Sequence, residues 1–334
     1  MSNQKTKTSN KIFILALCAV LCALSFPAEA QQPVKIPRIV RLSPTSAAGD
    51  APVLAAFRQG LRNHGWVERR NIAIDYRFAD GKREKLAGLA AEIAQSNPDV
   101  ILTGATWGAE AAKRATQTIP IVMVTTGDPV ASGLVNSLAR PGGNLTGVTA
   151  LGQELSGKRL QLLKEAVPNI TRVAVLSNPT NPDSALSVKE AEIAARELGV
   201  QLQVYQVDGL DGFHPAFRRI ANERAGALIV LTDPMFLTHR KRIVELTNQS
   251  RVPAMYPISE FANAGGLMFY GASFTDMYRR TATYVHKILN GAKPADLPIE
   301  RAQKFDLVIN LKAAKQIGLT IPPNVLARAD RVIR

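Results

Sequence analysis

Small residues, hydroxyl-bearing residues and two aspartates stand directly after short apolar runs of the sequence. The residues that we predict to contact a ligand are Ser43, Thr103, Gly104, Ala105, Thr106, Trp107, Asp128, Ser177, Asn178, Asp233 and Tyr256. Hydroxyl and backbone N–H groups bind carboxylates, and a carboxylate accepts hydrogen bonds from an ammonium group. These residue types predict a site that binds a small polar solute.

The two aspartates have two interpretations. Asp128 and Asp233 each precede a proline. Asp is favoured at the N-cap of a helix and Pro at its first position, so both are candidates for helix capping. Either one could instead accept a hydrogen bond from a ligand ammonium group. The two roles are compatible only where the carboxylate faces the ligand.

The aromatic candidates also have two interpretations. Trp107, Tyr256 and Tyr270 could stack on an apolar or aromatic part of a ligand, although buried aromatic residues are more often part of the core. Trp107 has the better case because it stands among small residues after an expected strand end. Glu260 follows shortly after Tyr256 and is a weaker candidate, since it could cap the following turn.

The sequence lacks the motifs of common enzymes. No Gly-x-Gly-x-x-Gly follows the first expected strand, and neither a phosphate-binding Gly-x4-Gly-Lys-Ser/Thr loop nor a Gly-x-Ser-x-Gly motif is present. The four histidines are scattered, without a pair at metal-binding helical spacing. We therefore expect a protein that is not an enzyme and that uses no metal or cofactor.

The first thirty residues have the pattern of a secretory signal. Lys5, Lys7 and Lys11 precede an apolar run over residues 12–24, and Ala28 and Ala30 then form a small-x-small cleavage site. We expect residues 1–30 to be a cleaved signal peptide and the protein to be periplasmic, the alternative being an uncleaved anchor. Cleavage would remove both cysteines, so the mature chain would form no disulfide.

The formal net charge of the 334-residue chain is +14. Its basic clusters are spread along the sequence and are not interleaved with aromatic residues, unlike the pattern of single-strand nucleic-acid binders. We interpret them as solvated helix faces and expect no nucleic-acid partner.

The remainder of the chain contains the same pattern twice. The stretch from Arg38 to Thr45 resembles the stretch from Arg172 to Thr180, which begins 134 residues later. Apolar strands alternate with amphipathic helices in both halves, which predicts an α/β fold of two similar, doubly wound parallel-sheet lobes joined by a hinge. We expect an N-terminal lobe of residues 36–149 plus 257–302 and a C-terminal lobe of residues 150–256 plus 303–334. Ligands bind at the carboxyl ends of parallel strands, so the candidate residues would face a cleft between the lobes.

Several longer motifs are typical of one protein family. They are the segments 139–147 (ARPGGNLTG), 155–160 (LSGKRL), 304–312 (KFDLVINLK), 321–323 (IPP) and 326–330 (LARAD). With them, the chain resembles ABC-transporter substrate-binding proteins of the group that includes tryptophan- and phenylalanine-binding members. The resemblance implies a type I periplasmic binding fold with three crossovers between lobes. It also implies a solute-binding role for Ser43, Thr103–Thr106, Asp128, Ser177, Asn178 and Asp233, whereas Trp107 stands where many relatives are expected to have a small residue.

The resemblance also implies partners. We expect a monomer that binds an amino acid or an aromatic or amide-like compound and delivers it to a membrane permease driven by a cytoplasmic ATPase. A periplasmic sensor that presents the ligand to a receptor would have the same fold and site, so the sequence does not separate the two. A secreted α/β enzyme is the third hypothesis, and it lacks a catalytic constellation.

Overall fold

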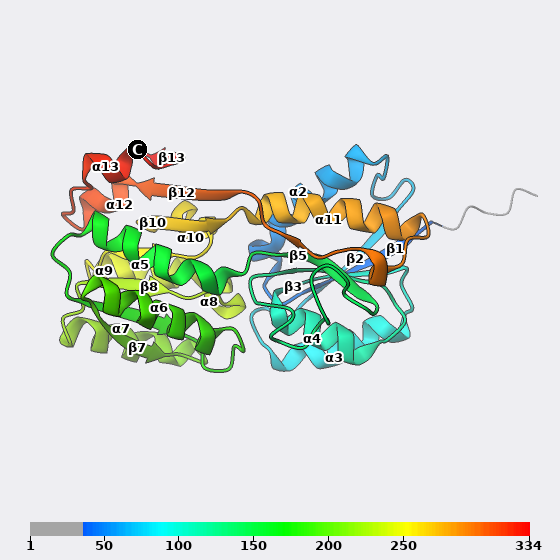
Figure 1. The fold of residues 1–334 in the computed structure, drawn as a ribbon, viewed down its shortest axis with the longest axis horizontal. Helices are drawn as coiled ribbons and strands as arrows, with labels where there is room; N and C mark the ends of the chain where they lie inside the picture. The colour runs from blue at the N-terminus through cyan, green and yellow to red at the C-terminus, as the bar shows by residue number, and fades with distance from the viewer. Residues whose placement is uncertain (1–35) are drawn as a thin grey trace, which may run out of the picture. The chain divides into compact units, whose positions relative to one another are not determined.

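The computed structural model describes residues 36–334, and the expected signal peptide lies outside the described residues. Residues Pro37–Arg334 form one compact unit, which contains two β-sheets covered by helices (Figure 1). No helix within residues 36–334 is both long enough and apolar enough to cross a membrane.

The first sheet has six parallel strands in the order β11-β5-β4-β3-β1-β2. They are β1 (Arg38–Ser43), β2 (Ala73–Phe78), β3 (Val100–Gly104), β4 (Ile121–Thr125), β5 (Leu145–Thr149) and β11 (Glu300–Arg301). The helices of this lobe are α2 (Ala47–Asn63), α3 (Glu84–Gln95), α4 (Ala105–Ala115) and α11 (Phe274–Leu289), with the short η3 (Pro294–Asp296). Apolar residues on α2 and α11 share one core cluster, and those on α3 and α4 share another. Helices therefore cover both faces, which explains why β3, β4 and β5 are buried along their whole length.

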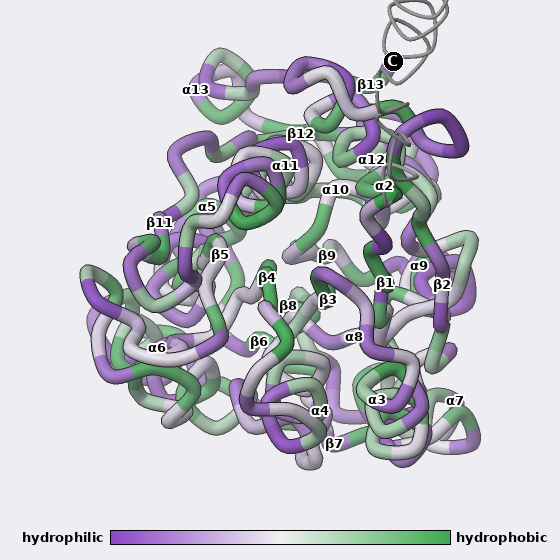
Figure 2. The backbone as a smooth tube through the Cα atoms, turned by 90° about the vertical axis from the view of Figure 1, so that its right-hand side faces the viewer, coloured by the Kyte–Doolittle hydropathy of each residue, from purple (hydrophilic) through white to green (hydrophobic). Residues whose placement is uncertain are grey.

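The second sheet has seven strands in the order β13-β12-β10-β9-β8-β6-β7. They are β6 (Arg172–Ser177), β7 (Gln201–Gln206), β8 (Ala227–Val230), β9 (Ala254–Tyr256), β10 (Met268–Ala272), β12 (Phe305–Asn310) and β13 (Arg331–Ile333). Its helices are η1 (Gly152–Glu154), α5 (Leu155–Ala166), α6 (Ser184–Leu198), η2 (Leu210–Gly212), α7 (Phe213–Asn222), α8 (Pro234–Thr238), α9 (Arg240–Gln249), α10 (Ser259–Asn263), α12 (Leu311–Gln316) and α13 (Pro323–Leu326). Strand β12 runs antiparallel to β10, whereas the other pairs are parallel. Figure 2 shows the hydrophobic stretches of the central strands β3 and β4 in green.

The two sheets repeat one topology. The order β5-β4-β3-β1-β2 in the first sheet corresponds to β10-β9-β8-β6-β7 in the second. The prediction of two similar, doubly wound parallel-sheet lobes is therefore confirmed.

One expected lobe boundary needs correction. We expected residues 257–302 in the N-terminal lobe, but β10 within that range pairs with β9 and β12 of the second sheet. Its residues are almost all buried, so the strand completes the second core, and the chain passes to the first lobe only at α11. The other passages between the sheets lie after β5 and after β11 (Figure 1).

Candidate functional site

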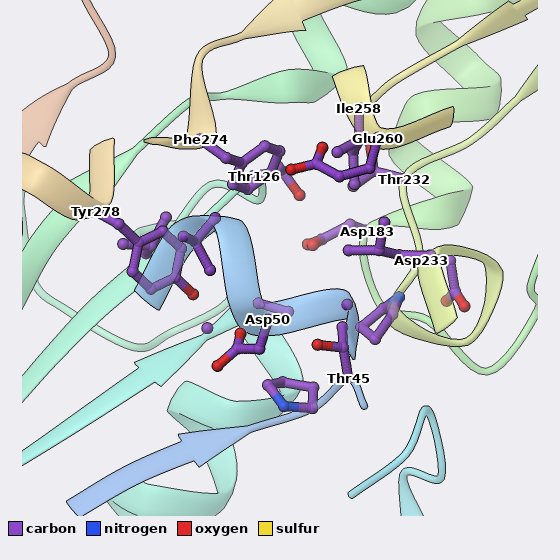
Figure 3. Close-up of a pocket in the computed structure, with 18 of the residues that line it drawn as sticks. Thr45, Asp50, Thr126, Asp183, Thr232, Asp233, Ile258, Glu260, Phe274 and Tyr278 are labelled. Atoms are coloured by element: carbon purple, nitrogen blue, oxygen red, sulfur yellow. The ribbon is translucent and has the colours of Figure 1, made fainter. Parts of the chain in front are cut away.

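A cleft opens between the lobes at the carboxyl ends of their strands, where ligands bind in open parallel sheets. The polar and aromatic residues that line it are Arg41, Thr45, Asp50, Thr126, Asn181, Asp183, Thr232, Asp233, Glu260, Phe274 and Tyr278. Figure 3 shows Asp50 and Tyr278 on one side of the cleft, facing Asp183, Asp233 and Glu260 on the other.

On the first-lobe side, a cation is already paired. The guanidinium of Arg41 donates to both oxygens of Asp50 at 2.9 and 2.7 Å, and also to the hydroxyl of Tyr278 at 2.7 Å. Its remaining nitrogen donates to the carbonyl of Leu42 at 3.1 Å. Burial raises the pKa of Tyr278 to about 12, so its hydroxyl stays protonated and can donate to a ligand. Arg41 therefore positions Tyr278 but brings no net charge to the cleft.

The start of α4 forms the floor of the first-lobe side. Gly104 is the N-cap, and no side chain bonds to the free N–H groups of the first turn. Ala105 lines the cleft with a φ of 56°, in the left-handed region that residues other than glycine rarely adopt. A strained residue beside uncapped N–H groups is typical of sites where a backbone approaches a ligand.

The second-lobe side is acidic. Asp183, Asp233 and Glu260 line it, and among the described lining residues Arg41 is the only cation. Glu260 is 7% exposed and accepts a hydrogen bond from the hydroxyl of Ser259 at 3.1 Å. Burial raises the pKa of Asp183 to about 6, against the opposing effect of a hydrogen bond from Thr106, and the nearby acids Glu110, Asp233 and Asp128 raise it further.

The carboxylate of Asp233 accepts four hydrogen bonds. One oxygen caps α8 by accepting from the N–H groups of Met235 and Phe236 at 2.8 and 3.2 Å. The other accepts from the side-chain amides of Asn178 and Asn181 at 3.1 and 2.9 Å. Burial raises the pKa of Asp233, and these bonds oppose the effect. Asp233 thus holds the loop between β6 and α6 in place while one edge of it borders the cleft.

Of the eleven candidates, Gly104, Ala105 and Asp233 line the cleft. The hydroxyl groups of Ser43, Thr103, Thr106 and Ser177 are buried. Thr103 donates to the carbonyl of Leu42 at 3.1 Å, and Ser43 lies 3.2 Å from the hydroxyl of Thr45. None of these four residues lines the cleft, and neither does Asn178. The hydroxyl of Thr106 instead donates to Asp183 of the second lobe at 2.8 Å.

Three candidates lie elsewhere. Trp107 is 3% exposed and packs in the core cluster of α3, with the guanidinium of Arg83 5.6 Å from its ring centroid. Tyr256 is fully buried in the second core and stacks on Phe261. Asp128 accepts from the N–H groups of Val130 and Ala131 at 2.8 and 3.1 Å, so it caps a turn beside the cleft. The structure thus agrees with the alternative interpretations, core packing for the two aromatic residues and capping for Asp128.

Several lining residues were missed from the sequence. The sequence could have indicated Arg41 and Asp50. A charged residue inside the apolar run of β1 needs a buried partner of opposite charge. Asp183 lies six residues after the end of β6, in a polar loop whose residue types do not distinguish it from its neighbours. Phe274 and Tyr278 come from α11, whose contact with α2 is not evident from sequence spacing. Within residues 36–334, no group of three or more His, Cys, Asp or Glu side chains is placed to hold a metal ion.

The chain matches known proteins over most of its length. Residues 47–333 match the family model described as ABC transporter substrate binding protein. A curated relative, the tyrosine-binding protein of Clostridioides difficile (strain R20291), is 24% identical over 264 residues, which is 79% of this chain and 75% of the relative.

Solved structures agree. A conserved domain protein from Vibrio cholerae is 30% identical with a TM-score of 0.83, covering 89% of this chain and 100% of that one. An ABC domain from Streptococcus pneumonia in complex with L-Trp is 25% identical with a TM-score of 0.82, covering 89% and 99%. An ABC transporter periplasmic solute binding protein from Actinobacillus succinogenes, at 16% identity, 84% and 99% coverage and a TM-score of 0.56, shares the fold alone. These likenesses confirm the predicted periplasmic-binding fold, and the chain belongs to the family of ABC transporter substrate-binding proteins.

Proposed function

We infer that this protein is the periplasmic substrate-binding component of an ABC importer. Residues 1–30 direct its export as a cleaved signal, and the mature chain works as a monomer without catalysis or a nucleic-acid partner. It closes its lobes on one small solute and delivers it to a membrane permease driven by an ATPase. Membership of the family and the cleft at the strand ends support this function.

The distribution of charge in the cleft carries the inference about the ligand. Asp50 neutralises Arg41, so Asp183, Asp233 and Glu260 leave the second-lobe side anionic. A buried carboxylate without a counter-charge is costly, and a ligand ammonium group removes that cost. The ligand therefore carries an amine, which contacts Asp183 and Glu260, with Asp233 at the edge of this subsite.

The opposite end of the ligand has different partners. The free N–H groups after Gly104 and Ala105, together with the hydroxyl of Tyr278, suit a carboxylate. Apolar side chains complete the cleft, namely Val53, Val124, Leu237, Ile258 and Phe274. An α-amino acid with an apolar or aromatic side chain fits all three subsites. The relatives described as tyrosine-binding and as an L-Trp complex favour the same class.

Ligand identity can be tested directly. Native mass spectrometry of the purified protein would detect a co-purified solute. A thermal-shift panel of amino acids, their amides and aromatic acids would then rank candidates. A ligand at a hundred times its Kd adds about 2.7 kcal/mol to the free energy of unfolding. A large shift with an aromatic amino acid is the expected result. Absence of any shift across the amine-bearing members would contradict the proposed amino-acid ligand.

A further inference from the structure

The loop between β6 and α6 of the second lobe contacts the first lobe directly. The hydroxyl of Thr106, at the start of α4, donates to Oδ2 of Asp183 at 2.8 Å. The guanidinium of Arg83, on the same lobe as Thr106, donates to the carbonyl of Thr180. This loop, residues 178–183, therefore joins the lobes at the rim of the cleft.

The contact at Asp183 depends on a close fit. A Cβ atom placed on Gly127 would lie 2.3 Å from Oδ1 of Asp183 and 2.5 Å from the hydroxyl oxygen of Thr106. The Thr106 hydroxyl lies 3.0 Å from that of Thr125, which accepts from the N–H of Gly127 at 3.0 Å. Since the Thr106 hydroxyl uses its hydrogen to donate to Asp183, it accepts a hydrogen bond from the Thr125 hydroxyl. The first lobe thus presents a prearranged donor and a gap that admits one carboxylate.

No ion pair recorded within residues 36–334 includes Asp183. The charged groups around it are acids from three other elements, Glu110 on α4, Asp233 at the N-cap of α8 and Asp128 after β4. Glu260 lines the same side of the cleft, while Arg41 across it is paired with Asp50. The nearby cation Arg83 is engaged by the Thr180 carbonyl and by Glu110 at 3.4 Å. The contact of the two lobes therefore holds a partly buried carboxylate among other acids, without a counter-charge.

We propose that Asp183 couples closure of the lobes to a cationic group on the ligand. This proposal rests on the function proposed above and assigns the coupling to one residue. When the lobes part, the contacts with Thr106 and Gly127 break and Asp183 meets water. When they close without a ligand, the ionised carboxylate loses water and gains only acidic neighbours. A ligand ammonium group supplies the missing charge, so the empty closed form is disfavoured and the occupied closed form is favoured.

The direction of this coupling follows from Asp183 itself. Its pKa rises from an ordinary 3.8 to about 6 where the lobes are in contact, and the first-lobe acids Glu110 and Asp128 contribute to the rise. A carboxyl whose pKa is higher when the lobes are in contact opposes empty closure at neutral pH, where it is ionised. Replacing Asp183 with Asn keeps the shape and a hydrogen bond to Thr106 but removes the charge. The variant should therefore close without a ligand.

Small-angle X-ray scattering of the ligand-free mature protein at pH 7.5 tests this directly. We expect Asp183→Asn to have a smaller radius of gyration than the wild type. Gly127→Ala should stay expanded, because its methyl group would lie only 2.3 Å from the position that Oδ1 of Asp183 takes in the contact. Gly143→Ala is the matched control, since nothing lies within 4 Å of a Cβ placed there. An Asp183→Asn variant that is folded by circular dichroism and as expanded as the wild type would overturn the proposal.

Calorimetric titrations test the ligand side. The probes are L-tryptophan and L-tyrosine, each paired with its analogue lacking the amine, 3-indolepropionate and 3-(4-hydroxyphenyl)propionate. Asp183→Asn should lose at least tenfold affinity for an amino acid that the wild type binds, and much less for the deaminated analogue. Equal losses for both would contradict recognition of the amine by Asp183. If the wild type binds no amine-bearing solute, the proposed ligand class fails, while the scattering of the ligand-free variants still decides whether Asp183 opposes closure.

Discussion

At the residue scale, the ion pair of Arg41 with Asp50 affects both the stability of the fold and the charge of the binding cleft. Arg41 and Asp50 are 1% and 3% exposed and share two hydrogen bonds. Losing one partner of a buried pair leaves the other charge uncompensated, whereas replacing both with apolar residues removes the problem. The pair therefore behaves as one unit.

We expect Arg41→Met to lower the free energy of unfolding by about 3–5 kcal/mol, because Asp50 would remain charged and buried. The double variant Arg41→Met with Asp50→Leu should recover most of the loss. Denaturant unfolding followed by circular dichroism measures both. A double variant that is less stable than the single one would show that the hydrogen bonds to Tyr278 and Leu42 matter more than the buried charge.

Ala105 offers a second test at this scale. Its φ of 56° costs about 1–2 kcal/mol for an L-residue, and glycine avoids this cost while losing about 0.5–1 kcal/mol of backbone entropy. Ala105→Gly should therefore be neutral or stabilising by up to about 1 kcal/mol in thermal unfolding. Ala111→Gly, further along the same helix, should cost about 1 kcal/mol. Equal losses in both variants would mean that Ala105 is not strained.

At the element scale, the sequence predicted which strands form but not which way the helices after them turn. Strands buried on both faces are continuous apolar runs, so β3, β4 and β8 were evident. The sequence places Trp107 among small residues after an expected strand end, but α4 already begins at Ala105. Successive helical residues turn by about 100°. Trp107 therefore packs in the core cluster between α3 and the first sheet, while Ala105 faces the cleft. Helix phase depends on the exact first residue, which sequence patterns locate poorly.

Sequence patterns also failed to locate the boundary between the lobes at β10. The repeat of strand and helix could be followed as far as β9, and the next strand, β10, carries Tyr270 and Gly271 in a short segment without clear alternation. Its membership of the second sheet comes from pairing with β9 and with the distant β12. Such pairing across about forty residues is set by tertiary packing, not by local pattern.

Capping supplies a prediction for the elements around the cleft. Asp233→Ala removes the cap of α8 and leaves the amides of Asn178 and Asn181 without their shared acceptor. We expect a loss of about 2–4 kcal/mol in unfolding free energy, the sum of a lost cap and unsatisfied buried donors. Asp128→Ala, at a more exposed cap, should cost about 1 kcal/mol. Comparable losses in urea unfolding would indicate that the Asp233 network is not a support for the loop.

At the scale of the whole molecule, the charge of the cleft is opposite to that of the chain. The chain carries a formal +14, yet four acids and one arginine line the cleft. The basic residues therefore lie mainly outside the site, and they do not predict an anionic ligand. Composition describes the exterior, whereas binding depends on the few groups that the folded lobes bring together.

The final prediction concerns pH and joins the residue to the motion of the lobes. The pKa of Asp183 is higher in the closed arrangement, about 6, than its ordinary 3.8. Protons therefore bind the closed form more tightly, so closure without ligand is most favoured below about pH 4 and is lost as the pH rises through about 6. Titrating the ligand-free protein from pH 7.5 to 5 should reduce its radius of gyration. The Asp183→Asn variant should give a flat profile over the same range, since it lacks the titrating group. A wild-type profile as flat as that of the variant would show that Asp183 does not govern closure, and a steep profile in both would assign the pH response to other carboxylates.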